Sequence, residues 1–145
     1  MKILVGVDDS KYSGVGLRAI INQFRPENTE VKVLHVLQTV VPLAPPEMSL
    51  GYVPEMEYQK KPALALVERT AGELRSAGFK VDTAIEVGDV RERIIDTAEA
   101  WHADLIVVGS HGQGGIESFL LGSVAESVAR HAKCSVEIVR APAKV

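Results

Sequence analysis

The residues best suited to chemistry lie in one glycine-rich segment, from Gly109 to Ser123. An apolar run, Leu105–Val108, precedes the segment, and a helical pattern begins where it ends. Glycine lets backbone N–H groups approach a ligand closely, because it has no Cβ atom. The start of a helix adds unpaired N–H groups and the positive end of the helix dipole. The sequence therefore predicts an anion site that bends around Gly109 and Gly112, ends at Gly122 and gains a hydroxyl donor from Ser123.

Ser123 also has a purely structural interpretation. It stands three residues before Glu126, which is the spacing of a capping box, where each side chain bonds the other residue's backbone N–H. Capping and phosphate contact are compatible, since the N–H groups of the first turn still face outward. Taken alone, the glycine-rich segment is a signal of modest specificity.

Five runs rich in β-branched residues predict the strands that would position this segment. The strands are expected at Ile3–Asp8, Val31–Leu37, Lys80–Val87, Asp104–Gly109 and Ser135–Arg140. Apolar and polar residues alternate in the third run, which indicates a strand at the edge of the sheet.

Helical patterns fill the spaces between these strands. The helices are expected at Lys11–Phe24, Tyr58–Ala77, Val90–Trp101 and Ser123–Ala132. Asp9 or Ser10 could cap the first helix and Asp89 the third. Gly78 could end the second helix.

Strict alternation of strand and helix predicts a doubly wound, Rossmann-like α/β fold. Five parallel strands would form one sheet with helices on both faces. In such folds ligands bind beyond the carboxyl ends of the strands, at the point where the winding reverses. The connection from Gln38 to Met56 is expected to be irregular, because it contains four prolines. It is a candidate lid or partner surface.

Length and composition indicate one globular domain across residues 1–145, since 46% of the residues are hydrophobic and 24% are charged. The net charge is -3 and no run of basic residues occurs, so the sequence does not indicate a surface that binds nucleic acid. No apolar stretch reaches the roughly 20 residues that a membrane helix needs. Cys134 is the only cysteine, so we expect a reducing, cytoplasmic location.

The glycine spacing resembles a known nucleotide-binding pattern. Gly109-x-x-Gly112, nine further residues and then Gly122-Ser123 is similar to the motif of the ATP-binding branch of the universal stress protein family. The likeness extends over nearly the whole chain and includes Ile3–Ser10, Val33–Val36, Gly88–Asp89 and Ala103–Gly112.

The resemblance implies a binding site in two parts. The adenine pocket would consist of Val7, Asp8, Val36 and Val108. The phosphate contacts would come from Gly109, His111, Gly112, Gly122, Ser123 and Val124. It also implies a homodimer through the last strand, Ser135–Arg140, and a stress-response regulator or sensor with an unidentified protein partner.

One departure from the family concerns the charge of the phosphate loop. Many relatives carry Lys or Arg between the second and third motif glycines, whereas Gln113–Leu121 has no basic residue and contains Glu117. The loop is therefore expected to hold ATP less firmly, or to need Mg²⁺ or Mn²⁺ on the phosphates. This favours AMP or ADP more than in a typical relative.

Catalysis has little support in the sequence. No Gly-Lys-Ser/Thr motif places a lysine on the phosphates, and no base for water or arginine finger is identifiable. Any ATP hydrolysis is expected to be slow, and no catalytic or metal-ligating residue is assigned.

Two alternative functions remain. One is an interaction module of the same fold that does not bind nucleotide. The other is a phosphoacceptor receiver domain, because Asp8 and Asp9 form an acidic pair after the first strand. Receivers also need an aspartate closing the third strand and a lysine closing the fifth. Here Asp89 fits a helix cap better and Arg140 stands in place of the lysine.

Overall fold

The structure, a computed structural model, describes residues 1–10, 13–38, 52–111 and 121–140. Its strands are β1 (Lys2–Gly6), β2 (Glu30–Leu37), β3 (Lys80–Val87), β4 (Leu105–Gly109) and β5 (Ser135–Val139). Its helices are α1 (Ser13–Gln23), α2 (Tyr52–Ser76), α3 (Val90–Trp101) and α4 (Ser123–His131), with a short 3-10 helix, η1 (Pro26–Asn28).

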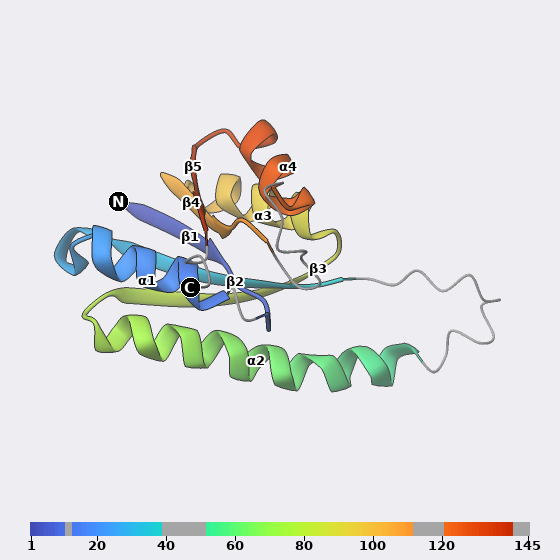
Figure 1. Cartoon of the computed structure of the whole chain (residues 1–145). Coiled ribbons are helices and arrows are strands. Elements are labelled where there is room, and N and C mark those ends of the chain that lie inside the picture. The colour runs from blue at the N-terminus through green and yellow to red at the C-terminus, as the bar shows by residue number, and fades with distance from the viewer. Residues whose placement is uncertain (11–12, 39–51, 112–120, 141–145) are drawn as a thin grey trace, which may run out of the picture.

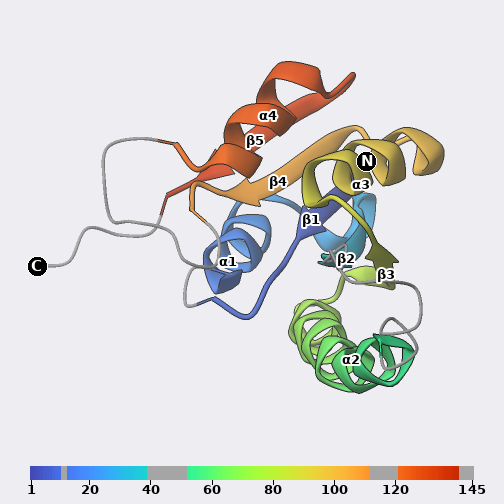
Figure 2. The same cartoon turned by 90° about the vertical axis from the view of Figure 1, so that its right-hand side faces the viewer.

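The strands form one sheet in the order β3-β2-β1-β4-β5, and every neighbouring pair is parallel. Helices α1 and α2 cover one face, and α3 and α4 cover the other (Figures 1 and 2). The expected doubly wound α/β fold is confirmed, and so is the edge position of β3. The winding reverses between β1 and β4, because β2 and β3 extend the sheet on one side and β5 on the other.

This strand order also argues against a receiver domain. Flavodoxin-like sheets, which include the receivers, have the order 2-1-3-4-5, with the switch point between their first and third strands. Here β1 lies between β2 and β4. Asp89, the residue nearest to the position of a receiver's phosphoacceptor, instead caps α3, where its side chain accepts from Glu92 N at 3.2 Å.

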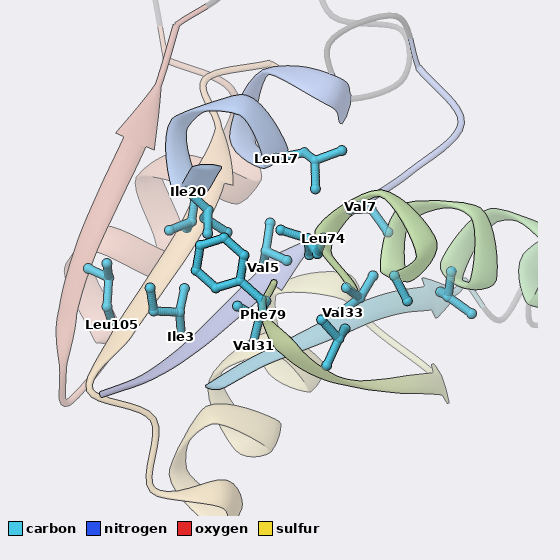
Figure 3. Close-up of a cluster of buried hydrophobic side chains, with 14 of the residues drawn as sticks. Ile3, Val5, Val7, Leu17, Ile20, Val31, Val33, Leu74, Phe79 and Leu105 are labelled. Carbon is cyan, nitrogen blue, oxygen red and sulfur yellow. The ribbon is translucent and has the colours of Figure 1, made fainter. Parts of the chain in front are cut away.

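The core has two halves, one on each face of the sheet. On the side of α1 and α2, Ile3 and Val5 of β1 pack with Ile20, Leu74 and Phe79 (Figure 3). On the opposite side Leu4, Ile106 and Val128 are buried together. Because both faces of β1 are covered, its apolar residues run without interruption.

The helix ends show which local signals were sufficient. Gly78 has φ +99°, and Phe79 N donates to Leu74 O at 3.1 Å, so α2 ends before Gly78 as expected. Its start was wrong by six residues, because α2 begins at Tyr52. Proline is tolerated in a first helical turn, where its missing N–H has no partner to lose. Pro54 lies in that turn. The irregular connection was expected to continue to Met56, but residues 52–56 are helical. Residues 39–51 lie outside the described residues.

The last helix begins at Ser123, as expected, and the first is described from Ser13 onward. Residues 11 and 12 lie outside the described residues, so the cap expected from Asp9 or Ser10 stays a prediction. Ser10 N donates to Asp8 Oδ1 at 2.9 Å, a local turn of the kind that Asp favours. None of the helices in the described ranges is long and apolar enough to cross a membrane.

Candidate functional site

The candidate site lies at the switch point between β1 and β4. Both strands are parallel, and Val5 is level with Val107, so their carboxyl ends meet at one edge of the sheet. Val7 and Asp8 follow β1, and Gly109 closes β4. The structure therefore brings the predicted residues of the first and fourth strands together. This is the edge where ligands of doubly wound sheets bind.

The start of α4 faces the end of β4 at very short range. Gly122 N donates to Ser110 O at 2.8 Å. A Cβ atom on Gly122 would lie 2.8 Å from the same oxygen and 3.5 Å from His111 Cα. Both obstructing atoms belong to the backbone, so neither can rotate away. Only glycine permits this approach of helix and strand.

Gly122 is also the N-cap of α4, with extended backbone angles and no side-chain cap bond. The capping box predicted for Ser123 is wrong, because Ser123 is already the first helical residue and Glu126 pairs with Arg130 at 3.0 Å. Glu126 N donates to Gly122 O at 3.0 Å. Within the described ranges, the N–H groups of Ser123 and Val124 donate no hydrogen bond, which leaves donors for an anion.

His111 follows β4 beside the same helix start. Its Nδ1 lies 3.1 Å from the hydroxyl oxygen of Ser110. Ser110 is only 5% exposed, and its N–H donates to Val139 O at 2.9 Å. This serine was missed in the sequence, although it stands between Gly109 and His111. It ties the end of β4 to β5 and fixes the point from which the loop departs.

The three valines predicted for the adenine pocket do not form a single apolar surface. Val7 belongs to the buried cluster under α1 and α2, whereas Val36 and Val108 belong to the cluster under α3 and α4. Side chains at successive strand positions alternate between the faces, and because helices cover both faces, all three valines are 8% exposed or less. What these residues can offer a ligand at the edge of the sheet is mainly their backbone N–H and C=O groups.

The remaining predicted residues complete the description. Asp8 is partly exposed and closes the turn after β1. Gly112 lies outside the described residues. Among the residues that the structure describes, no three His, Cys, Asp or Glu side chains are placed to hold a metal ion. A hollow lies elsewhere, at the amino ends of the strands around Met1, Asn28 and Asp104, and no predicted site residue lines it.

Comparison with known proteins identifies the fold and its family. The sequence model of the Universal stress protein family matches residues 1–140. This chain belongs to the universal stress protein family. Universal stress protein YxiE of Bacillus subtilis is 30% identical over 145 residues, which cover 96% of this chain and 98% of the relative.

Two solved structures are similar over almost the whole chain. MJ0577 of Methanocaldococcus jannaschii has a TM-score of 0.76 at 31% identity, and the match covers 99% of this chain and 97% of that protein. A universal stress protein in complex with cAMP has a TM-score of 0.70 at 25% identity, and the match covers 97% of this chain and 96% of that protein. The second structure contains an adenine nucleotide.

Proposed function

We propose that this universal stress protein binds an adenine nucleotide at the carboxyl ends of β1, β2 and β4. The observation that carries the proposal is the contact at Gly122, where a Cβ atom would collide with Ser110 O. A helix start pressed this closely against a strand end, with N–H groups that donate no bond to the described residues, is suited to phosphate. The similar structure that contains cAMP supports the same ligand class.

The phosphates would be held mainly by backbone donors. The N–H groups of Ser123 and Val124 and the dipole of α4 provide positive potential, while Gly109, His111 and Gly112 would supply the other side. Hydrogen bonds to charged groups contribute about 1.5–3 kcal/mol each, so a few such donors suffice for a phosphate monoester. With no basic residue in Gln113–Leu121, ATP would carry Mg²⁺ or Mn²⁺ on its phosphates, and AMP or ADP would bind comparably.

The base would lie against Val7, Asp8, Val36 and Val108. Since the valine side chains are buried, recognition of adenine would depend on backbone groups at the edge of the sheet. The protein would then act as a nucleotide-dependent regulator or sensor in a stress response, with slow hydrolysis or none. Its protein partner is unidentified, and the cytoplasmic location expected from the single Cys134 stays a prediction.

A second copy of the chain would pair with β5. This strand is at the edge of the sheet, and the Ser110–Val139 bond shows that Val139 directs its N–H and C=O toward β4. Backbone groups alternate along a strand, so those of Val136 and Ile138 point away from the sheet. An edge with free backbone groups is a template for strand pairing, which supports the homodimer through Ser135–Arg140.

Isothermal titration of AMP and of ATP, each with and without Mg²⁺, tests the proposed ligand. We expect both nucleotides to bind, with affinities within about tenfold of each other and ATP helped by the metal. Mass spectrometry of the denatured, gently purified protein should release adenine nucleotide. If no heat and no released nucleotide are found, the chain is an interaction module that does not bind nucleotide. A large, metal-independent preference for ATP would contradict the backbone-donor account.

A further inference from the structure

The carbonyl group of Val7 has a side-chain partner instead of a strand partner. His35 Nδ1 lies 2.8 Å from Val7 O. A carbonyl oxygen only accepts, so Nδ1 carries the hydrogen and donates it. The contact joins the residue after β1 to a residue within β2, 28 positions apart in sequence.

The pairing of β1 with β2 stops at this point. The register ends with Gly6 opposite Leu34, and the last backbone bond runs from Val7 N to Leu34 O at 2.9 Å. In a regular parallel ladder the next bond would run from Val36 N to Val7 O. That bond is absent from the described part of the chain, and the ring of His35 is bonded to the oxygen instead.

The alternation of the strand decides where the unused groups of Val36 point. Leu34 O accepts from β1, while Leu37 O accepts from Gly88 N beside β3. Val36 is two residues from Leu34, so its N–H and C=O face the side of β1. Because the pairing of β1 with β2 ends at Val7, the groups of Val36 on this side face the edge of the sheet at the switch point. A donor and an acceptor therefore stand next to each other there, in the pattern that an adenine edge can match.

We propose that His35 is a positioning residue for the base, because its bond to Val7 O keeps the Val36 N–H out of the ladder and available to adenine. This inference rests on the proposed nucleotide site and names a determinant of its base specificity. Without the imidazole donor, Val7 O would turn back to Val36 N–H, and β1 would extend by one ladder bond. The base would then have to break that bond in order to bind.

Two variants separate the donor from the bulk of the ring. His35→Phe keeps a planar ring and removes the donor, whereas His35→Asn keeps an N–H near the position of Nδ1. His131→Phe is a matched control, because His131 Nδ1 also contacts a backbone oxygen, that of Ser127 at 2.9 Å, at the far end of α4.

The first measurement is amide hydrogen exchange of Val36 by NMR without nucleotide. A hydrogen bond with a net worth of about 1 kcal/mol slows exchange by about fivefold. We expect Val36 exchange to slow by about that factor or more in His35→Phe, and to stay at the wild-type rate in His35→Asn and His131→Phe. Equal exchange rates in wild type and His35→Phe would overturn the proposal.

The second measurement is the affinity for AMP beside that for ribose 5-phosphate, which lacks the base. His35→Phe should weaken AMP by about fivefold or more and leave ribose 5-phosphate unchanged, with affinity restored in His35→Asn. An equal loss for both ligands, or no loss for AMP, contradicts the role of His35 alone. Failure of the wild-type protein to bind AMP overturns the proposed function, and the adenine role of His35 with it.

Discussion

The amide N–H of Gly122 donates to the carbonyl oxygen of Ser110 at 2.8 Å, across the gap between α4 and β4. The Cβ atom of any other residue at position 122 would stand at the same 2.8 Å from that oxygen. The hydrogen bond and the requirement for glycine therefore have one geometric cause. They fix the start of α4 beside Ser110 and His111, where the proposed phosphate site lies.

The cap of α3 should make a measurable and pH-dependent contribution to stability. Asp89 Oδ1 accepts from Glu92 N at 3.2 Å, and Arg91 lies 3.3 Å from Oδ2. We expect Asp89→Ala to lower the free energy of unfolding by about 1 kcal/mol at pH 7. Urea denaturation checks this value. Asp89→Asn is the control, since asparagine caps about as well as aspartate.

The sign of the pH dependence follows from the pKa of Asp89. The hydrogen bond from Arg91, followed by that from the Glu92 amide, lowers the pKa of this carboxyl below its ordinary 3.8. The charged form therefore stabilises the folded state above the unfolded pKa, and this contribution is lost as the pH falls through the lower folded value. The difference in unfolding free energy between the wild type and Asp89→Ala should shrink below a pH of about 4. A difference that grows in acid would contradict the assignment.

Helix α2 offers a matched pair of leucines that tests which face is core. Leu74 is fully buried, whereas Leu64 is 52% exposed. Leu74→Ala should lower the free energy of unfolding by about 2–5 kcal/mol, because it removes buried methyl groups and leaves a cavity. Leu64→Ala should change it by less than about 0.5 kcal/mol. Similar losses in the two variants, measured by urea denaturation, would mean that α2 packs differently.

The proposed homodimer can be tested at one N–H group. The backbone of Val136 points away from the sheet, so Val136→Pro removes an outward donor without breaking a bond to β4. Val136→Ala trims the side chain but keeps the donor. In sedimentation equilibrium we expect a dimer for wild type and Val136→Ala, and a monomer for Val136→Pro. A dimer that persists in a folded Val136→Pro protein would exclude pairing through this edge of β5.

Local signals were enough to predict the fold class. The uninterrupted apolar run of β1 reflects burial on both faces, and this strand lies in the centre of the sheet. The alternation of apolar and polar residues in β3 reflects burial on one face, and this strand lies at the edge. Asp89 caps the start of α3 through a bond from Glu92, three positions away. Gly78 follows the end of α2, where the bond from Phe79 to Leu74 spans five positions. A sequence window contains all the partners of such bonds, so they can be read without a structure.

Contacts between distant segments could not be predicted in this way. Whether Gly122 or Ser123 caps α4 depends on how closely β4 approaches the helix start, and Ser110 sets that distance. The bond from His35 to Val7 O exists only because β1 and β2 are neighbours and diverge after Gly6. The sequence placed these residues near the site but contained no sign of the bonds between them.

Titration of AMP into Gly122→Ala, beside Gly72→Ala, tests the central claim most directly. Gly72 lies in α2 with nothing within 4 Å of an added Cβ atom, so its variant should keep the wild-type affinity and gain up to about 1 kcal/mol of stability. Gly122→Ala forces the start of α4 away from Ser110, and strain of about 1–3 kcal/mol predicts AMP binding weaker by about fivefold or more. A folded Gly122→Ala protein that binds AMP as tightly as wild type would contradict the account.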